Sequence, residues 1–229
     1  MKKWKFLSFL IGFFVLSYGL GLIFHDKYLL GSTTLFLGCF QNLLMVNGKW
    51  YEKSVGILET VFNAVVNFVN GLYGTVLLAF FVSLPISIFS LVNWKKNQQN
   101  GIVKINKMST KLSIFVILAI TLATIVISFL LSLIPSQNLP TLDTLSIILT
   151  ISGTLLIALR FKEGWIFWIF SSVINFTKWC VMLTKNLTNN AIMMMICAIV
   201  YFALNIWGYV SFLKMRKKQE NYNNQEIKA

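Results

Sequence analysis

Four polar side chains line one face of the apolar segment at residues 54–71. Glu59, Asn63, Asn67 and Asn70 follow one another at intervals of four, four and three, which is the repeat of one helical face. Three amides and a carboxylate turned to hydrocarbon would cost several kcal/mol. The pattern therefore predicts either the wall of a cavity that binds a polar ligand or a face packed on another helix through polar groups.

A second stripe, in the apolar segment at 164–183, mixes indoles with hydrogen-bonding groups. Its members, at intervals of three, four, three and four, are Trp165, Trp168, Ser172, Asn175 and Trp179. Indole faces stack on flat heteroaromatic rings and attract cations, while amides and hydroxyls fix the orientation of a bound molecule. This composition predicts a site for a small aromatic or cationic ligand.

Three residues near this stripe have simpler explanations than ligand binding. Trp165 stands at the inner end of its segment, where aromatic side chains commonly form an interfacial belt. Lys178 is expected to extend its amine outward to the membrane surface. Asp143 opens the preceding apolar segment, where the dipole of a helix favours an acid in the first turn.

The last apolar segment, residues 191–213, carries a third polar stripe. Tyr201, Asn205 and Gly208 lie at intervals of four and three. The amide of Asn205 needs a ligand or a protein partner at its depth in the membrane. Gly208 would permit the close approach of a second helix.

Residues for catalysis, metal binding or cofactor binding do not stand out. His25 has no metal-ligating company, and the sequence holds no Cys-x-x-Cys, phosphate loop, His-Glu-x-x-His or nucleophile elbow. We therefore expect a protein that is not an enzyme, with no metal and no cofactor.

The composition indicates the surroundings of these stripes. Of 229 residues, 57% are apolar and 12% are charged, and the mean hydropathy is +0.73. A soluble globule of this size cannot hide so much apolar surface. The net charge of +13 clusters between apolar runs and does not interleave with aromatic residues, so nucleic acid is excluded as a partner.

Eight apolar runs have the character of membrane helices, which need about 20 residues each. They cover residues 6–24, 28–47, 54–71, 73–93, 112–134, 141–159, 164–183 and 191–213. The first is longer than the apolar core of a signal peptide and is expected to be retained. With the N-terminus inside, all of the 20 Lys and Arg except Lys27, Lys178 and Lys185 fall in inner segments. The sequence thus predicts an all-α integral membrane protein with about eight transmembrane helices and both ends inside.

Residues 94–111 form a basic linker near the middle of the chain, and the segments on either side of it end alike. Aligning these ends places Ser87 on Asn205, Ser90 on Gly208 and Trp94 on Phe212, with Lys after both. The pattern predicts two parallel units of three helices, which is typical of transporters that bind their substrate between the halves. The alternative is that membrane helices ending in Trp and Lys look alike because interfaces favour both residues.

Four motifs stand in order along the chain. They are Leu72-Tyr73-Gly74, Asn93-Trp94-Lys95-Lys96, Arg160-Phe161-Lys162-Glu163-Gly164-Trp165-Ile166-Phe167-Trp168 and Asn205-Ile206-Trp207-Gly208-Tyr209. The third is similar to R-x-x-x-x-W-x-x-W and the fourth to N-I-Y-G-W of the Pnu family of bacterial vitamin transporters, whose best-known members carry nicotinamide riboside. Over residues 29–214 the chain resembles a divergent member of that family.

The resemblance implies a fold similar to that of the sugar-transporting SWEET proteins. Two parallel three-helix bundles would be joined by a linking helix, and the first helix of this chain would be an addition to that core. It also implies facilitated diffusion of a substrate held between the bundles by Trp and Asn side chains, with phosphorylation inside the cell trapping the vitamin.

Three positions depart from the family pattern. Ser172 stands where the family has Asn after W-x-x-W, Glu59 stands where the matching first-half helix has Asn, and Ser87 stands where the closing motif has Asn. These changes leave the substrate open among nicotinamide riboside, thiamine and related vitamins or nucleosides. A carboxylate such as Glu59 would suit a cationic vitamin.

These observations combine into one hypothesis, a facilitated-diffusion uniporter for a vitamin-type substrate in the bacterial cytoplasmic membrane. The competing hypothesis is the substrate-binding membrane subunit of an energy-coupled vitamin importer. The partners are the small-molecule substrate and membrane lipids, and a homo-oligomer is left open. The residues expected to bind substrate are Trp168, Ser172, Asn175, Trp179, Asn205, Asn63, Asn67, Glu59 and Tyr201.

The expected domain organisation follows the repeat. It comprises an extra N-terminal helix (1–27), a first three-helix repeat (28–94), a basic inner loop with the linking helix (95–134), a second three-helix repeat (135–214) and a polar cytoplasmic tail (215–229). Within this tail we expect residues 217–229 to be disordered.

Overall fold

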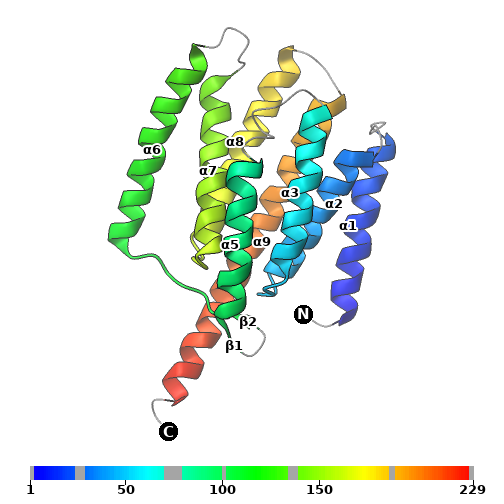
Figure 1. Cartoon of the computed structure of the whole chain (residues 1–229). Helices are drawn as coiled ribbons and strands as arrows, with labels where there is room; N and C mark the ends of the chain where they lie inside the picture. The colour runs from blue at the N-terminus through cyan, green and yellow to red at the C-terminus, as the bar shows by residue number, and fades with distance from the viewer. Residues whose placement is uncertain are drawn as a thin grey trace. The chain divides into compact units, whose positions relative to one another are not determined.

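The computed structural model describes residues 3–23, 29–69, 79–99, 102–133, 139–185 and 189–226, and most of them are helical (Figure 1). In chain order the elements are α1 (Lys3–Ile23), α2 (Leu30–Met45), α3 (Glu52–Val69), a π-helical turn η2 (Ala79–Ser83), α5 (Leu84–Lys96), β1 (Gln98–Gln99), β2 (Ile102–Val103), α6 (Thr110–Ser132), α7 (Pro140–Ala158), α8 (Gly164–Lys185) and α9 (Asn189–Glu226). The predicted helical architecture is confirmed.

Five helices in the described part of the chain are long and apolar enough to cross a membrane. They are Trp4–Ile23, Thr110–Ser132, Pro140–Ala158, Gly164–Thr184 and Met195–Glu220. The chain is therefore a multi-pass membrane protein.

The runs predicted at 112–134, 141–159 and 164–183 match α6, α7 and α8 to within two residues. Helix α2 has 16 residues, and the run predicted at 73–93 begins among residues 70–78, which lie outside the described residues. The count of eight thus stays a prediction.

The chain divides into two compact units. The first comprises Met1–Ile105, Ala158–Arg160 and Val210–Ala229, and the second comprises Asn106–Ile157 and Phe161–Tyr209. Within the first unit α1 packs on α2, α2 on α3 and α3 on α5, as Figure 1 shows. Leu35, Cys39 and Leu43 of α2 recur every fourth residue and are buried. One continuous apolar face of α2 therefore forms the centre of this unit.

A residue in the left-handed conformation stands in the turn that follows each of α2 and α7. Gly48 follows α2 with φ 66° and Arg160 follows α7 with φ 68°. Such a residue commonly ends a helix, and it costs a non-glycine residue about 1–3 kcal/mol. The guanidinium of Arg160 offsets part of this cost because its Nη1 donates to the carbonyl of Lys104 at 3.3 Å. The first residue of the R-x-x-x-x-W motif thus has a structural role.

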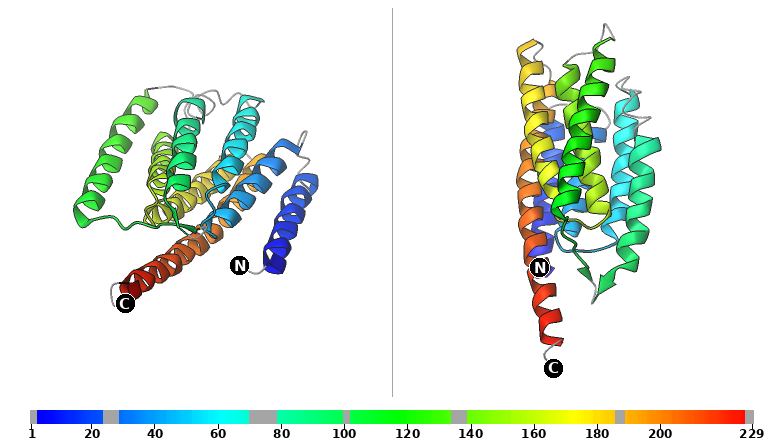
Figure 2. Two further views of the ribbon diagram at one scale, coloured as in Figure 1. Left: turned by 60° about the horizontal axis from the view of Figure 1, so that its bottom comes forward. Right: turned by 90° about the vertical axis from the view of Figure 1, so that its left-hand side faces the viewer.

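The C-terminal helix is hydrogen-bonded to the second part of the basic linker. The side chain of Gln219 in α9 donates from Nε2 to the carbonyl of Val103 and accepts from the backbone N–H of Ile105, both at 3.0 Å. The side-chain amide of Gln219 makes the two hydrogen bonds that a residue of a neighbouring strand would make. It therefore pairs one backbone carbonyl and one backbone N–H of the linker. The expectation of disorder from residue 217 is wrong for residues 217–226, because α9 continues to Glu226 in one unbroken ribbon (Figure 2).

A buried ion pair stands at the start of α3. The carboxylate of Glu52 and the amine of Lys53 are 2.7 Å apart, with side chains 0% and 6% exposed. The amide of Gln41 donates to the second carboxylate oxygen at 3.3 Å. Burial raises the pKa of Glu52 above its ordinary value of 4.5, because lost hydration outweighs the opposing effects of Lys53 and Gln41.

This raised pKa predicts how stability depends on pH. The folded protein holds the Glu52 proton more tightly than the unfolded chain does, so the contribution of Glu52 to stability is greatest below pH 4.5 and falls as pH rises through the folded pKa. Glu52→Gln cannot ionise. The melting temperature of Glu52→Gln minus that of the wild type, measured in detergent, is therefore expected to increase from pH 4.5 to pH 8. A difference that stays flat or decreases over that range would contradict the argument.

Candidate substrate-binding site

The indole of Trp168 is held in one orientation by α7 and by its own helix. Its Nε1 donates to the carbonyl of Thr150 at 3.2 Å. Its ring meets the ring of Trp165 edge to face, with centroids 5.3 Å apart. A Cβ added at Gly153 would overlap the Trp168 ring, so the glycine makes room for it. Trp168 stays half-buried and is a preorganised aromatic side chain.

Asn205 joins α9 to α8 beside this indole. Its Nδ2 donates to the hydroxyl of Ser172 at 3.0 Å and to the carbonyl of Trp168 at 3.1 Å. The Ser172 hydroxyl in turn donates to the same Trp168 carbonyl at 2.9 Å. Asn205 and Ser172 are 5% and 6% exposed. The structure therefore brings three predicted site residues together, and it uses both amide hydrogens of Asn205 for helix packing.

A polar seam between α7 and α8 continues from Thr150, and sequence reasoning missed it. The Thr150 and Ser171 hydroxyls are 2.6 Å apart, and Ser171 also donates to the Ser146 carbonyl at 3.0 Å. The signal was present, because Asp143, Ser146 and Thr150 lie at intervals of three and four on α7. The seam fastens α7 to α8, so it fixes the helix that carries Trp168.

Lys178 and Asp143 close the far end of this seam. The Lys178 amine lies 2.9 Å from a carboxylate oxygen of Asp143 and donates to Ser146 Oγ at 3.4 Å. The amine therefore meets a carboxylate in the first turn of α7, whereas the sequence predicted that it would reach the membrane surface. In apolar surroundings the two opposite charges stabilise each other, so Asp143 takes the role that water at the membrane interface would have had.

Trp165 is fully buried, so its expected place in an interfacial belt is also wrong. A Cβ added at Gly208 of α9 would overlap the Trp165 ring. The expectation that Gly208 permits close approach of a helix is confirmed, and its partner is this indole.

The other predicted site residues that the structure describes lie on α8, α9 and α3. The Asn175 side-chain amide donates to the carbonyl of Ser171 at 3.0 Å. The centre of the Trp179 ring lies 5.8 Å from the Lys178 amine. Tyr201 is half-buried on α9, one turn before Asn205, and Glu59 is half-buried on α3 of the first unit. Three predicted positions fall outside the described side chains or residues: Asn63, Asn67 and Asn70.

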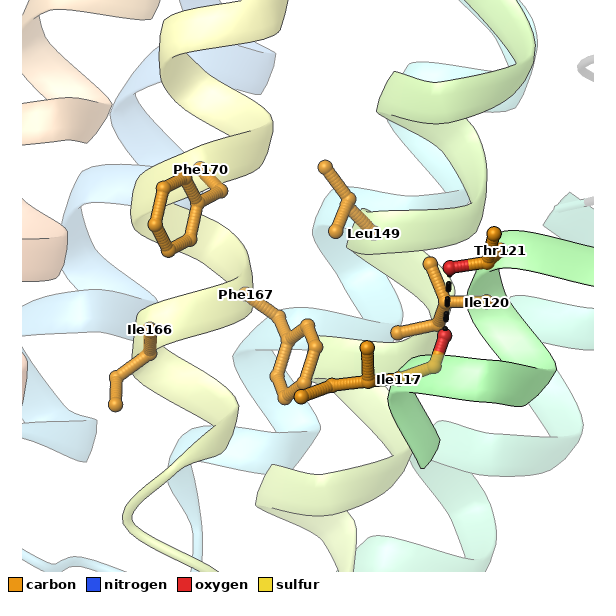
Figure 3. A pocket seen from close by; sticks show the side chains of 7 residues that line it. All are labelled: Ile117, Ile120, Thr121, Leu149, Ile166, Phe167 and Phe170. Atoms are coloured by element: carbon orange, nitrogen blue, oxygen red, sulfur yellow. Dashed lines mark hydrogen bonds between the residues drawn. The ribbon is translucent and has the colours of Figure 1, made fainter. Parts of the chain in front are cut away.

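An apolar groove of about 270 Å³ lies between α6, α7 and α8 (Figure 3). Its lining residues are Ile117, Ile120, Thr121, Leu149, Ile166, Phe167 and Phe170. The Thr121 hydroxyl is bonded to the Ile117 carbonyl at 3.0 Å. A polar ligand needs several placed polar groups, so this groove does not suit the substrate class predicted from the stripes.

Comparisons with known proteins agree on one class of protein, the transporters. A curated relative, the nicotinamide riboside transporter PnuC of Neisseria mucosa, is 24% identical over 203 residues, which cover 86% of this chain and 76% of the relative. The crystal structure of the vitamin B3 transporter PnuC superimposes with a TM-score of 0.76 at 23% identity, covering 93% of this chain and 92% of that one. At this identity the superposition shows a shared fold.

The family assignment rests on most of the chain. The sequence model of the family described as nicotinamide mononucleotide transporter matches residues 28–214. That range contains α2 to α8 and the apolar part of α9, together with the residues around Trp168 and Asn205. The family consists of transporters, so no catalytic constellation is required. The chain is a membrane transporter that belongs to the nicotinamide mononucleotide transporter family.

Proposed function

We propose that this chain is a facilitated-diffusion uniporter for a vitamin-type substrate, nicotinamide riboside or a close analogue, in the bacterial cytoplasmic membrane. The carrying observation is the preorganised Trp168 indole beside the buried Ser172–Asn205 pair within two membrane helices. In this proposal the two repeats lie on either side of the substrate and rock about it. Eight membrane helices with both ends inside complete the arrangement.

The chemistry of the cluster supports a flat cation as ligand. The pyridinium of nicotinamide riboside carries a positive charge, and an indole face attracts such a ring by stacking and by its π electrons. Thiamine has a cationic ring as well and is the second candidate. Asn175 and Trp179 extend the same stripe along α8, and Tyr201 adds a phenol from α9.

The charges favour the riboside over the mononucleotide. A phosphate ester would need a basic partner, and the basic residue of the α7–α8 seam, Lys178, is already paired with Asp143 at 2.9 Å. We therefore expect the unphosphorylated nucleoside to bind more tightly.

Liposome uptake tests the function and its alternative together. Purified protein in liposomes, without ATP or any ATPase partner, is expected to exchange labelled nicotinamide riboside with unlabelled riboside inside. Competition should rank the riboside ahead of its mononucleotide. Binding without exchange would favour the substrate-binding subunit of an energy-coupled importer. Exchange of thiamine but not riboside would reassign the substrate.

Trp168→Ala tests the proposed site. Loss of the indole face is expected to weaken riboside binding about tenfold or more, because a cation–π contact shielded from water is worth about 2 kcal/mol. Isothermal titration on purified protein measures the affinity. Phe170→Ala, on the same helix and 58% exposed, is the matched control and should bind normally. Equal affinity of Trp168→Ala and wild type would remove Trp168 from the site.

A further inference from the structure

We propose that Trp94 and Phe212 form the inner gate of the transport path, and that the linker at residues 102–105 lies over this gate as a strap. The inference rests on the proposed function and deepens it. It starts from an aromatic pair that the substrate stripes do not include.

The two rings occupy matching positions in the sequence repeat and contact each other. Aligning the ends of the two repeats places Trp94 of α5 on Phe212 of α9. Their ring centroids are 6.1 Å apart, and both side chains are 0% exposed. Two copies of a parallel repeat are related by an axis along the membrane normal, so equivalent residues meet where they reach that axis. A transport path between the repeats would follow the same axis, and this pair would close it.

Polar groups also stabilise the closed contact between Trp94 and Phe212. The Asn93 amide, adjacent to Trp94, donates to the carbonyl of Ala158 at the end of α7 at 2.8 Å. The amine of Lys53 lies 4.5 Å from the centre of the Trp94 ring, and the Lys53 side chain is 6% exposed. A desolvated cation–π contact is stronger than an exposed one. The gate therefore joins the start of α3, the end of α5, the end of α7 and the C-terminal part of α9.

The strap at residues 102–105 adds a second layer of contacts to the gate. Val103 donates to the carbonyl of Gly48 at 3.2 Å, and Gln219 binds both Val103 and Ile105. Arg160 donates to the Lys104 carbonyl between them. The side chains of Val103 and Ile105 are 0% and 5% exposed. The strap pairs with the residues that follow α5, because Gln98 of β1 lies opposite Val103 of β2 (Figure 1). Moving the aromatic pair apart would therefore strain the strap as well.

A thiol placed one turn from Trp94 reports whether the gate is open. Ser90 is 1% exposed, and cysteine is close to it in size. In inside-out vesicles, a membrane-impermeant maleimide is expected to label S90C slowly. Adding Trp94→Ala or Phe212→Ala should raise the labelling rate up to about tenfold, because loss of a buried aromatic contact shifts a two-state equilibrium by up to about that factor. Phe202→Ala, a more exposed phenylalanine of α9, should leave the rate unchanged.

The strap is tested separately by Gln219→Ala, which should raise the S90C labelling rate severalfold. Its control is Lys218→Ala, an exposed neighbour on α9. Site-resolved mass spectrometry reads the S90C thiol apart from the natural thiols of Cys39, Cys180 and Cys197. Equal labelling rates with and without the aromatic pair would overturn the gate.

A second experiment holds the gate closed instead of opening it. Joining W94C to F212C with a reducible bifunctional thiol reagent is expected to stop riboside exchange, and a reductant should restore it. Undiminished exchange after complete crosslinking would overturn the gate. If the wild type does not exchange riboside at all, the proposed substrate fails, whereas the labelling rates still decide whether this point opens and closes.

Discussion

Gly208→Ala is expected to lower the melting temperature of the detergent-purified protein by about 5–10 °C. The added Cβ would overlap the Trp165 ring, which is fully buried and cannot swing aside. Overpacking a tight core costs about 1–3 kcal/mol, and in a chain of this length each kcal/mol lowers the melting temperature by about 2–4 °C. Riboside binding should weaken in parallel, because Trp165 supports the edge of Trp168.

The matched control and the suppressor make this prediction specific. Gly12→Ala adds the same methyl group to α1 where no atom lies within 4 Å, and it should leave the melting temperature unchanged. Trp165→Leu removes the ring that the new methyl group meets, so Gly208→Ala combined with Trp165→Leu should be less destabilised than the sum of the two single changes. Simple additivity would show that the methyl group and the ring do not meet.

Much of the helical framework could be predicted from the sequence. Long apolar runs bounded by polar turns defined α6, α7 and α8 to within two residues, because a membrane helix depends mainly on length and hydropathy. The intervals that predicted a shared face for Ser172 and Trp168 also hold, and Gly208 meets a neighbouring helix as expected. Local periodicity fixes which residues share a face.

Periodicity did not predict which helix each face would meet. The seam of Ser146, Thr150 and Ser171 depends on the pairing of α7 with α8, which a single helix does not encode. For the same reason Lys178 was assigned to the membrane surface and Trp165 to an interfacial belt. The helical tail was missed because its stabilising partner, the backbone of Val103, lies 116 residues away from Gln219.

Asp143→Asn is expected to destabilise the protein by about 2–3 kcal/mol. The side chains of Lys178 and Asp143 are 16% and 29% exposed, and both come from membrane-spanning helices. Without the carboxylate, the ammonium of Lys178 would stand uncompensated in apolar surroundings, where a single charge costs about 2.5–3.5 kcal/mol. The measurement is the melting temperature of purified protein, which should fall by about 5–10 °C.

The double variant decides whether the pair itself is responsible. Asp143→Asn with Lys178→Gln removes both charges, and it should recover most of the lost stability because two amides can still hydrogen-bond to each other and to Ser146. Glu220→Gln breaks the Arg216–Glu220 pair, whose carboxylate is 51% exposed, and should cost less than about 1 kcal/mol. A double variant no more stable than Asp143→Asn would mean that Asp143 acts through its hydrogen bonds. If the pair is responsible, Asp143→Asn should also strengthen competition by the mononucleotide, because its phosphate could then bind the released Lys178.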